Sequence, residues 1–109
     1  MTRSVNLAVL HEMTDGDLSF DRRMFKAFLK SAYECLATLD KSWAKGMDMA
    51  WYQAAHAFKG ICLNLGAERL GQLCKEAQEQ CTAKAQKKKE LLKAIRSELE
   101  SVRQYLESL

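Results

Sequence analysis

The sequence predicts an all-α protein, folded as an antiparallel up-down four-helix bundle. The chain has 109 residues, of which 48% are hydrophobic and 28% charged, so we expect a single folded domain over residues 1–109. It contains no proline, the residue that breaks helices. Only nine residues are β-branched (three valines, two isoleucines and four threonines), and these are the types that favour strands. Together these observations favour long helices over sheets.

Four stretches carry apolar residues at spacings of three and four, the period that aligns side chains along one side of a helix. Asp15-Gly16-Asp17 precedes the first stretch, and Asp17 or Ser19 is the expected N-cap. The apolar positions are Phe25, Phe28, Ala32, Leu36, Leu39 and Trp43 in the first stretch; Trp51, Ala55, Phe58, Cys62 and Leu65 in the second; Leu70, Leu73 or Cys74, Ala77 and Cys81 in the third; and Leu92, Ile95, Leu99, Val102, Leu106 and Leu109 in the fourth.

Short breaks separate the four stretches. Lys45-Gly46 divides the first from the second, and Asp48 can cap the helix that follows. Leu65-Gly66-Ala67 predicts a tight joint, with Gly66 in the left-handed C-cap conformation. The third break falls near residues 82–88 and lacks glycine. Because short connections join antiparallel neighbours, the bundle is the economical arrangement. Residues 3–13 are expected to add a short N-terminal helix.

The net charge of +3 is local. Residues 1–83 hold ten basic and ten acidic residues, whereas residues 84–109 hold seven basic and four acidic ones. A nucleic-acid-binding domain needs a basic face of larger extent, so no nucleic-acid partner is expected. The run Lys87-Lys88-Lys89 is interpreted as a solvated helix start or loop; a role at an anionic surface is the alternative.

The four cysteines are Cys35, Cys62, Cys74 and Cys81. An even number could form two disulfides in a secreted domain, but Met1–Leu10 does not resemble a secretory signal. We therefore expect a cytoplasmic chain with reduced cysteines that pack as small hydrophobic residues. The sequence has no CxxC pair, the spacing that would suggest a metal site. It also has no apolar run that approaches the ~20 residues of a membrane span.

The second helix carries the informative face. At ~100° per residue, the side chains of Tyr52, Lys59, Gly60 and Leu63 lie within about 60° of His56, and Trp51, Phe58 and Leu65 lie on the opposite side. His56 is therefore expected to project away from the core. A surface histidine is common and usually has no function, but a mid-helix glycine costs ~1 kcal/mol relative to alanine. Close approach by another surface would explain Gly60, and these features suit a nucleophile that meets a large, phosphate-carrying partner.

The sequence resembles the histidine-containing phosphotransfer (HPt) domains of multistep two-component phosphorelays. Their pattern is roughly His-x-Leu-Lys-Gly, a few residues, Gly-Ala, then Leu and a Leu-Cys pair. The matching residues here are His56-Ala57-Phe58-Lys59-Gly60, Asn64-Leu65-Gly66-Ala67, Leu70 and Leu73-Cys74, and Gly16–Phe20 resembles the start of the family's first long helix. Phe58 replaces the usual leucine, and Ile61 stands where a small serine is common.

The resemblance implies roles for individual residues. His56 would be the phosphoacceptor, Lys59 would stabilise the phosphoryl charge, and Gly60 would give clearance to a receiver domain. Gln78 falls where the family often has a glutamine that holds the imidazole. It is expected on the polar side of the third helix with Gly71, Lys75 and Thr82. The further receiver-docking residues would be Tyr52, Leu63 and Lys75.

The resemblance also implies a phosphorelay intermediate. Such a protein accepts a phosphoryl group from a receiver-domain aspartate of a hybrid histidine kinase and passes it, in either direction, to a response-regulator aspartate. Such a protein is a phosphocarrier and not an enzyme, and no glycine-rich nucleotide loop is present that would allow it to phosphorylate itself from ATP. We expect a monomer. It would need no cofactor of its own, since Mg²⁺ belongs to the receiver domain.

The alternative to a phosphocarrier is a helical adaptor that binds receiver domains without carrying phosphate. A catalytic dyad of His56 with Cys62 fails, because Cys62 lies about 120° from His56 around the helix. His11, the other histidine, is given no role.

Overall fold

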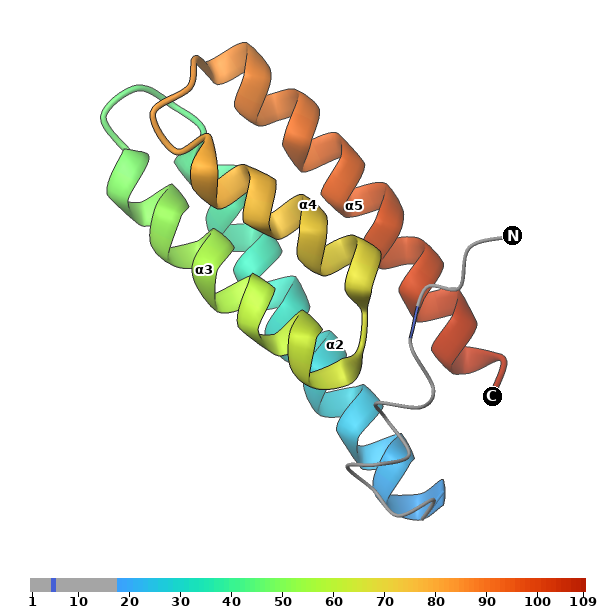
Figure 1. The fold of residues 1–109 in the computed structure, drawn as a ribbon. Coiled ribbons are helices and arrows are strands. Elements are labelled where there is room, and N and C mark those ends of the chain that lie inside the picture. Colours follow the sequence, from blue (N-terminus) through green and yellow to red (C-terminus); the bar gives the residue numbers. More distant parts are fainter. Residues whose placement is uncertain (1–4, 6–17) are drawn as a thin grey trace.

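The computed structural model describes residue 5 and residues 18–109. Within them the chain forms four helices: α2 (Leu18–Ser42), α3 (Asp48–Leu65), α4 (Glu68–Glu79) and α5 (Ala85–Glu107) (Figure 1). Successive helices run in opposite directions, and each packs against two others, since α2 contacts α3 and α5, and α4 contacts α3 and α5. The predicted four-helix bundle is confirmed. The expected N-terminal helix over residues 3–13 lies outside the described residues, apart from Val5.

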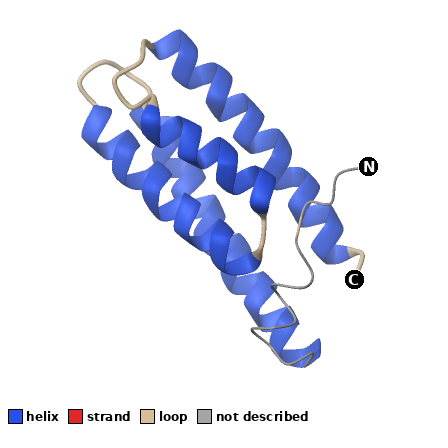
Figure 2. Cartoon of the chain, in the orientation of Figure 1, coloured by secondary structure: helices blue, strands red, loops and turns tan. Residues whose placement is uncertain are grey.

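The described part of the chain is helix and connecting loop throughout (Figure 2). The predicted apolar stripes form the core, because nearly all of their members are buried. The exceptions are Trp43 and Cys81, which are half-buried, and Leu109, which is exposed. Either Leu73 or Cys74 was expected in the third stripe, and Cys74 is the fully buried one.

The expected C-cap of α3 is confirmed, whereas the expected N-caps are not. Gly66 has φ +84° and its N–H donates to the carbonyls of Cys62 and Leu63, which confirms the predicted left-handed C-cap. Asp48 is not the N-cap of α3, because it is the first residue of the helix and Met47 precedes it as the cap. Ser19 likewise lies inside α2, and Asp17 is outside the described residues.

One lysine of the run Lys87-Lys88-Lys89 is buried, although the whole run was expected to be solvated. Residues 87–89 do lie at the start of α5, but the Lys88 side chain is only 1% exposed. Its Nζ donates to Asp48 Oδ1 at 2.6 Å and lies 5.5 Å from the centroid of the Trp51 ring. The interpretation as a solvated run is therefore wrong for Lys88, whose ammonium is compensated by a carboxylate and an aromatic face.

The four cysteines are unpaired with one another: Cys35, Cys62, Cys74 and Cys81. Cys62 and Cys74 are buried in the core between α3 and α4. A hydrogen bond with Cys74, together with burial, raises the pKa of the Cys62 thiol above its ordinary value. None of the helices described is both long and apolar enough to cross a membrane.

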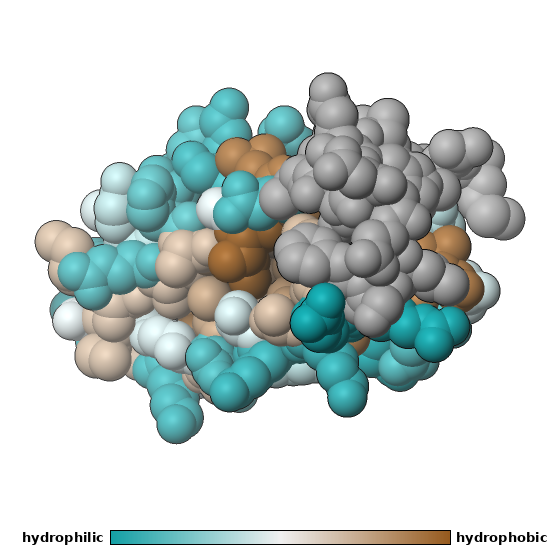
Figure 3. All heavy atoms as spheres, turned by 90° about the horizontal axis from the view of Figure 1, so that it is seen from below, coloured by the Kyte–Doolittle hydropathy of each residue, from teal (hydrophilic) through white to brown (hydrophobic). Residues whose placement is uncertain are grey.

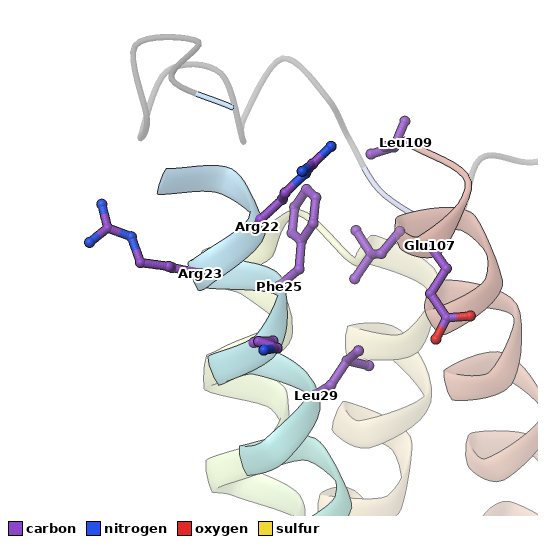
Figure 4. A pocket seen from close by; sticks show the side chains of 8 residues that line it. Arg22, Arg23, Phe25, Leu29, Glu107 and Leu109 are labelled. Atoms are coloured by element: carbon purple, nitrogen blue, oxygen red, sulfur yellow. The ribbon is translucent and has the colours of Figure 1, made fainter. Parts of the chain in front are cut away.

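A depression of about 820 Å³ lies where α2 begins and α5 ends (Figure 4). Apolar and charged side chains line it, and the charged ones are three basic residues and one acidic residue: Arg22, Arg23, Phe25, Lys26, Leu29, Leu106, Glu107 and Leu109. The view of the lower end shows hydrophobic residues reaching the surface between hydrophilic ones (Figure 3). The depression shares no lining residue with the face of α3 that carries His56.

Candidate functional site

His56 lies near the middle of α3 with an exposed side chain. The opposite side of the helix faces the core, because Trp51, Phe58 and Leu65 are all buried. The apolar spacing of α3 thus orients the imidazole outward, as the helical period predicts. Cys62 is buried and faces the core, so no dyad with His56 forms.

A glutamine of the neighbouring helix holds the imidazole. His56 Nδ1 lies 3.1 Å from Gln78 Oε1, a contact between residues 22 positions apart on α3 and α4. An amide oxygen can only accept, so Nδ1 carries the proton in this hydrogen bond. In the neutral ring the other nitrogen, Nε2, then keeps its lone pair and points away from Gln78. The site leaves one nucleophilic nitrogen free.

Tyr52 completes a network of three side chains. Gln78 Nε2 donates to the Tyr52 hydroxyl at 3.3 Å. The Tyr52 and His56 rings are parallel to within 3°, with centroids 6.2 Å apart, as expected for residues one turn apart on a helix. The sequence predicted Tyr52 on this face but gave no sign of its hydrogen bond to Gln78.

The other predicted docking residues surround this network. Leu63 is 59% exposed and Lys75 of α4 is also exposed. A Cβ atom added at Gly60 would have no neighbour within 4 Å beyond its own helical backbone, so none of the residues that the structure describes on other helices approaches this glycine closely. Lys59 is partly exposed and makes no salt bridge to the described residues. Among these residues no carboxylate neutralises its ammonium, which suits an anion from a partner.

Two residues expected on the polar side of α4 lie elsewhere. Gly71 is buried, and a Cβ atom there would lie 3.4 Å from Cys62 Cβ, because α4 packs closely on α3 at this point. Thr82 is exposed but follows the helix, which ends at Glu79. Lys75 and Gln78 are on the polar side as expected.

One contact at the site escaped the sequence analysis. Trp51, expected only as a core residue, donates from Nε1 to the carbonyl oxygen of Ala77 at 2.8 Å. No local pattern indicates a bond between positions 26 apart, although a buried indole N–H generally requires an acceptor. Within the described residues, no group of three or more histidine, cysteine or acidic residues could hold a metal ion.

An open surface around one held imidazole, beside a free ammonium, suits the transfer of an anionic group to and from a large partner. With the fold, this surface fits one class of protein: the helical bundles that carry a phosphoryl group on histidine.

Comparison with known proteins gives the family. The Hpt domain family model matches residues 23–107, the larger part of the chain. The chain therefore belongs to the Hpt domain family, which acts in histidine phosphotransfer within phosphorelays.

The fold is similar to that of a solved member. The crystal structure of histidine-containing phosphotransfer protein B (HptB) from Pseudomonas aeruginosa PAO1 matches with a TM-score of 0.88 and 24% sequence identity, over 99% of this chain and 95% of that chain. A search of curated protein sequences finds no match.

Proposed function

We propose that this chain is a phosphorelay intermediate whose phosphoacceptor atom is His56 Nε2. The donor is a phosphorylated aspartate in the receiver domain of a hybrid histidine kinase, and the acceptor is an aspartate of a response regulator. The observation that carries this proposal is the 3.1 Å contact between His56 Nδ1 and Gln78 Oε1 on an exposed face. This contact fixes the proton on Nδ1 and leaves Nε2 as the nucleophile.

The transfer step is a displacement at phosphorus. The Nε2 lone pair attacks, an N–P bond forms, and the P–O bond to the aspartate breaks with its electron pair leaving on the carboxylate. The ring then carries positive charge, which Gln78 Oε1 stabilises by accepting from Nδ1–H. Lys59 lies one turn from His56 and would neutralise the phosphoryl oxygens. The second transfer is the same step in reverse.

The partner supplies what this chain does not. Phosphoryl transfer depends mainly on positioning and charge neutralisation. We propose that the receiver domain brings Mg²⁺ and the aspartate, and that this chain acts as a carrier without a cofactor of its own. Tyr52, Gly60, Leu63 and Lys75 would form the docking surface. The open space over Gly60 supports this role, because no contact with another described helix accounts for a glycine inside α3.

Incubation with a ³²P-phosphorylated receiver domain tests the proposal. We expect the label to move to this chain as an acid-labile, base-stable adduct and to be lost in His56→Gln. The matched control is His11→Gln, which should be labelled like the wild type. An adaptor would bind the receiver and accept no phosphate. Wild-type labelling of His56→Gln, or stable binding without any label, would show that the proposal is wrong.

A further inference from the structure

Two adjacent residues of α3 bond to two adjacent residues of α4. The buried Trp51 Nε1 donates to the Ala77 carbonyl oxygen at 2.8 Å. On the surface, the Tyr52 hydroxyl accepts from Gln78 Nε2 at 3.3 Å. Both bonds join positions 26 apart in sequence. They are therefore consistent with one alignment of α4 along α3, one bond in the core and the other at the surface.

The buried bond fixes the end of α4 along α3. Ala77 lies in the last turn of α4, where carbonyl groups lack donors within the helix. The side chain of Trp51 is fully buried, so both groups depend on each other for a partner. A shift of α4 along α3 would leave both unpaired. Trp51 therefore sets the position of the backbone that leads directly into Gln78.

The surface bond fixes the amide of Gln78. Its oxygen faces His56 Nδ1 and its nitrogen faces the Tyr52 hydroxyl, so the amide is held at both ends. The Tyr52 ring in turn lies parallel to the imidazole, at a plane angle of 3°. A glutamine on a helix surface would otherwise sample several rotamers, and its oxygen would meet Nδ1 for only part of the time.

We infer that Trp51 and Tyr52 form a two-point clamp that positions Gln78 so that His56 stays in its Nδ1–H tautomer. Both are positioning residues that act through Gln78, Trp51 on its backbone and Tyr52 on its side chain. The effect on transfer rests on the proposed phosphoacceptor role of His56. The effect on the tautomer does not, because it is a property of the unphosphorylated chain.

The decisive measurement is the pair of His56 ring ¹⁵N chemical shifts in the free protein at a pH where the ring is neutral. In the wild type we expect the pattern of Nδ1–H and a lone pair on Nε2. Tyr52→Phe keeps the ring and removes the hydroxyl, and should move the tautomer ratio by about 2- to 5-fold toward Nε2–H, the size expected for one exposed hydrogen bond. Tyr33→Phe, an equally exposed tyrosine of α2, is the matched control and should leave the ratio unchanged.

Trp51→Phe tests the buried half of the clamp, with Trp43→Phe as its control. Shifts are compared at a temperature where circular dichroism shows each variant to be folded. We expect Trp51→Phe to move the ratio in the same direction as Tyr52→Phe, and Trp43→Phe to leave it unchanged. A folded Trp51→Phe protein with the wild-type ratio would remove Trp51 from the clamp.

The rates of phosphotransfer separate this inference from the proposed function. Tyr52→Phe should slow transfer from a phosphorylated receiver by a factor similar to its change in tautomer. A wild-type tautomer ratio in Tyr52→Phe would overturn the clamp even if His56 is the phosphoacceptor. If His56→Gln is labelled normally, the proposed function fails, and the chemical shifts still decide whether the clamp exists.

Discussion

Replacing Gly60 by alanine should stabilise the fold. Gly60 lies inside α3, five residues before its end, and an added Cβ would meet no described residue within 4 Å beyond its own helical backbone. Its substitution therefore changes only the helix propensity, which favours alanine by ~1 kcal/mol. For a domain of this size such a gain raises the melting temperature by roughly 4 °C.

Gly46→Ala is the matched control, with the opposite expected sign. A Cβ at Gly46 also has nothing within 4 Å, but this residue has φ +91°, in the left-handed region that costs an alanine ~1–2 kcal/mol. The same change of side chain should thus lower the melting temperature by roughly 4 °C or more.

Thermal unfolding followed by circular dichroism at 222 nm measures both variants under identical conditions, and urea unfolding gives the free energies. The prediction holds if Gly60→Ala raises the melting temperature and Gly46→Ala lowers it. A loss of stability in Gly60→Ala would mean that the glycine serves packing within the chain, and the argument for an open docking surface would lose its support.

Three further predictions concern the surface and the core. Gly60→Gln should fold at least as stably as the wild type yet slow transfer from a receiver, because its side chain fills the space beside His56. Acetyl phosphate, if it labels the wild type, needs no such clearance and should label the variant and the wild type alike. Lys59→Ala should change the free energy of unfolding by less than ~0.5 kcal/mol and slow transfer; an unchanged transfer rate would exclude its role. Cys62 should resist alkylation at pH 8 in the native state, because a hydrogen bond with Cys74 and burial raise the pKa of its thiol. The half-buried Cys35 should react sooner. Mass spectrometry of peptides measures the order in which the two cysteines are alkylated.

The fold was largely predictable because its signals are local. The three-four spacing of apolar residues fixes which side of each helix is buried, and the left-handed cap at Gly66 depends on a residue type at one position. The orientation of His56 follows from the same spacing. The pairing of His56 with Gln78 came from the family resemblance, and the structure places the two within hydrogen-bond distance.

Two of the errors concern residues whose neighbours are remote in sequence. Asp48 has the side chain of an N-cap, yet its carboxylate binds Lys88, 40 residues later, once α5 packs beside α3. Gly71 is expected on the polar face because it shares the helical spacing of Lys75 and Gln78, whereas the close packing of α4 on Cys62 buries it. Contacts of this kind depend on which helices become neighbours. The periodicity within one helix does not specify its neighbours.

The buried ammonium of Lys88 changes how this end of the bundle can open. Helix ends ordinarily fray at little cost in free energy. Here, moving the first turn of α5 into water would break the bond to Asp48 in the first turn of α3 and uncover the ring of Trp51. Trp51 in turn holds the last turn of α4. We therefore expect these three helix ends to open together as one cooperative unit, so that a fluctuation beginning at the start of α5 reaches the backbone next to Gln78 in the same event.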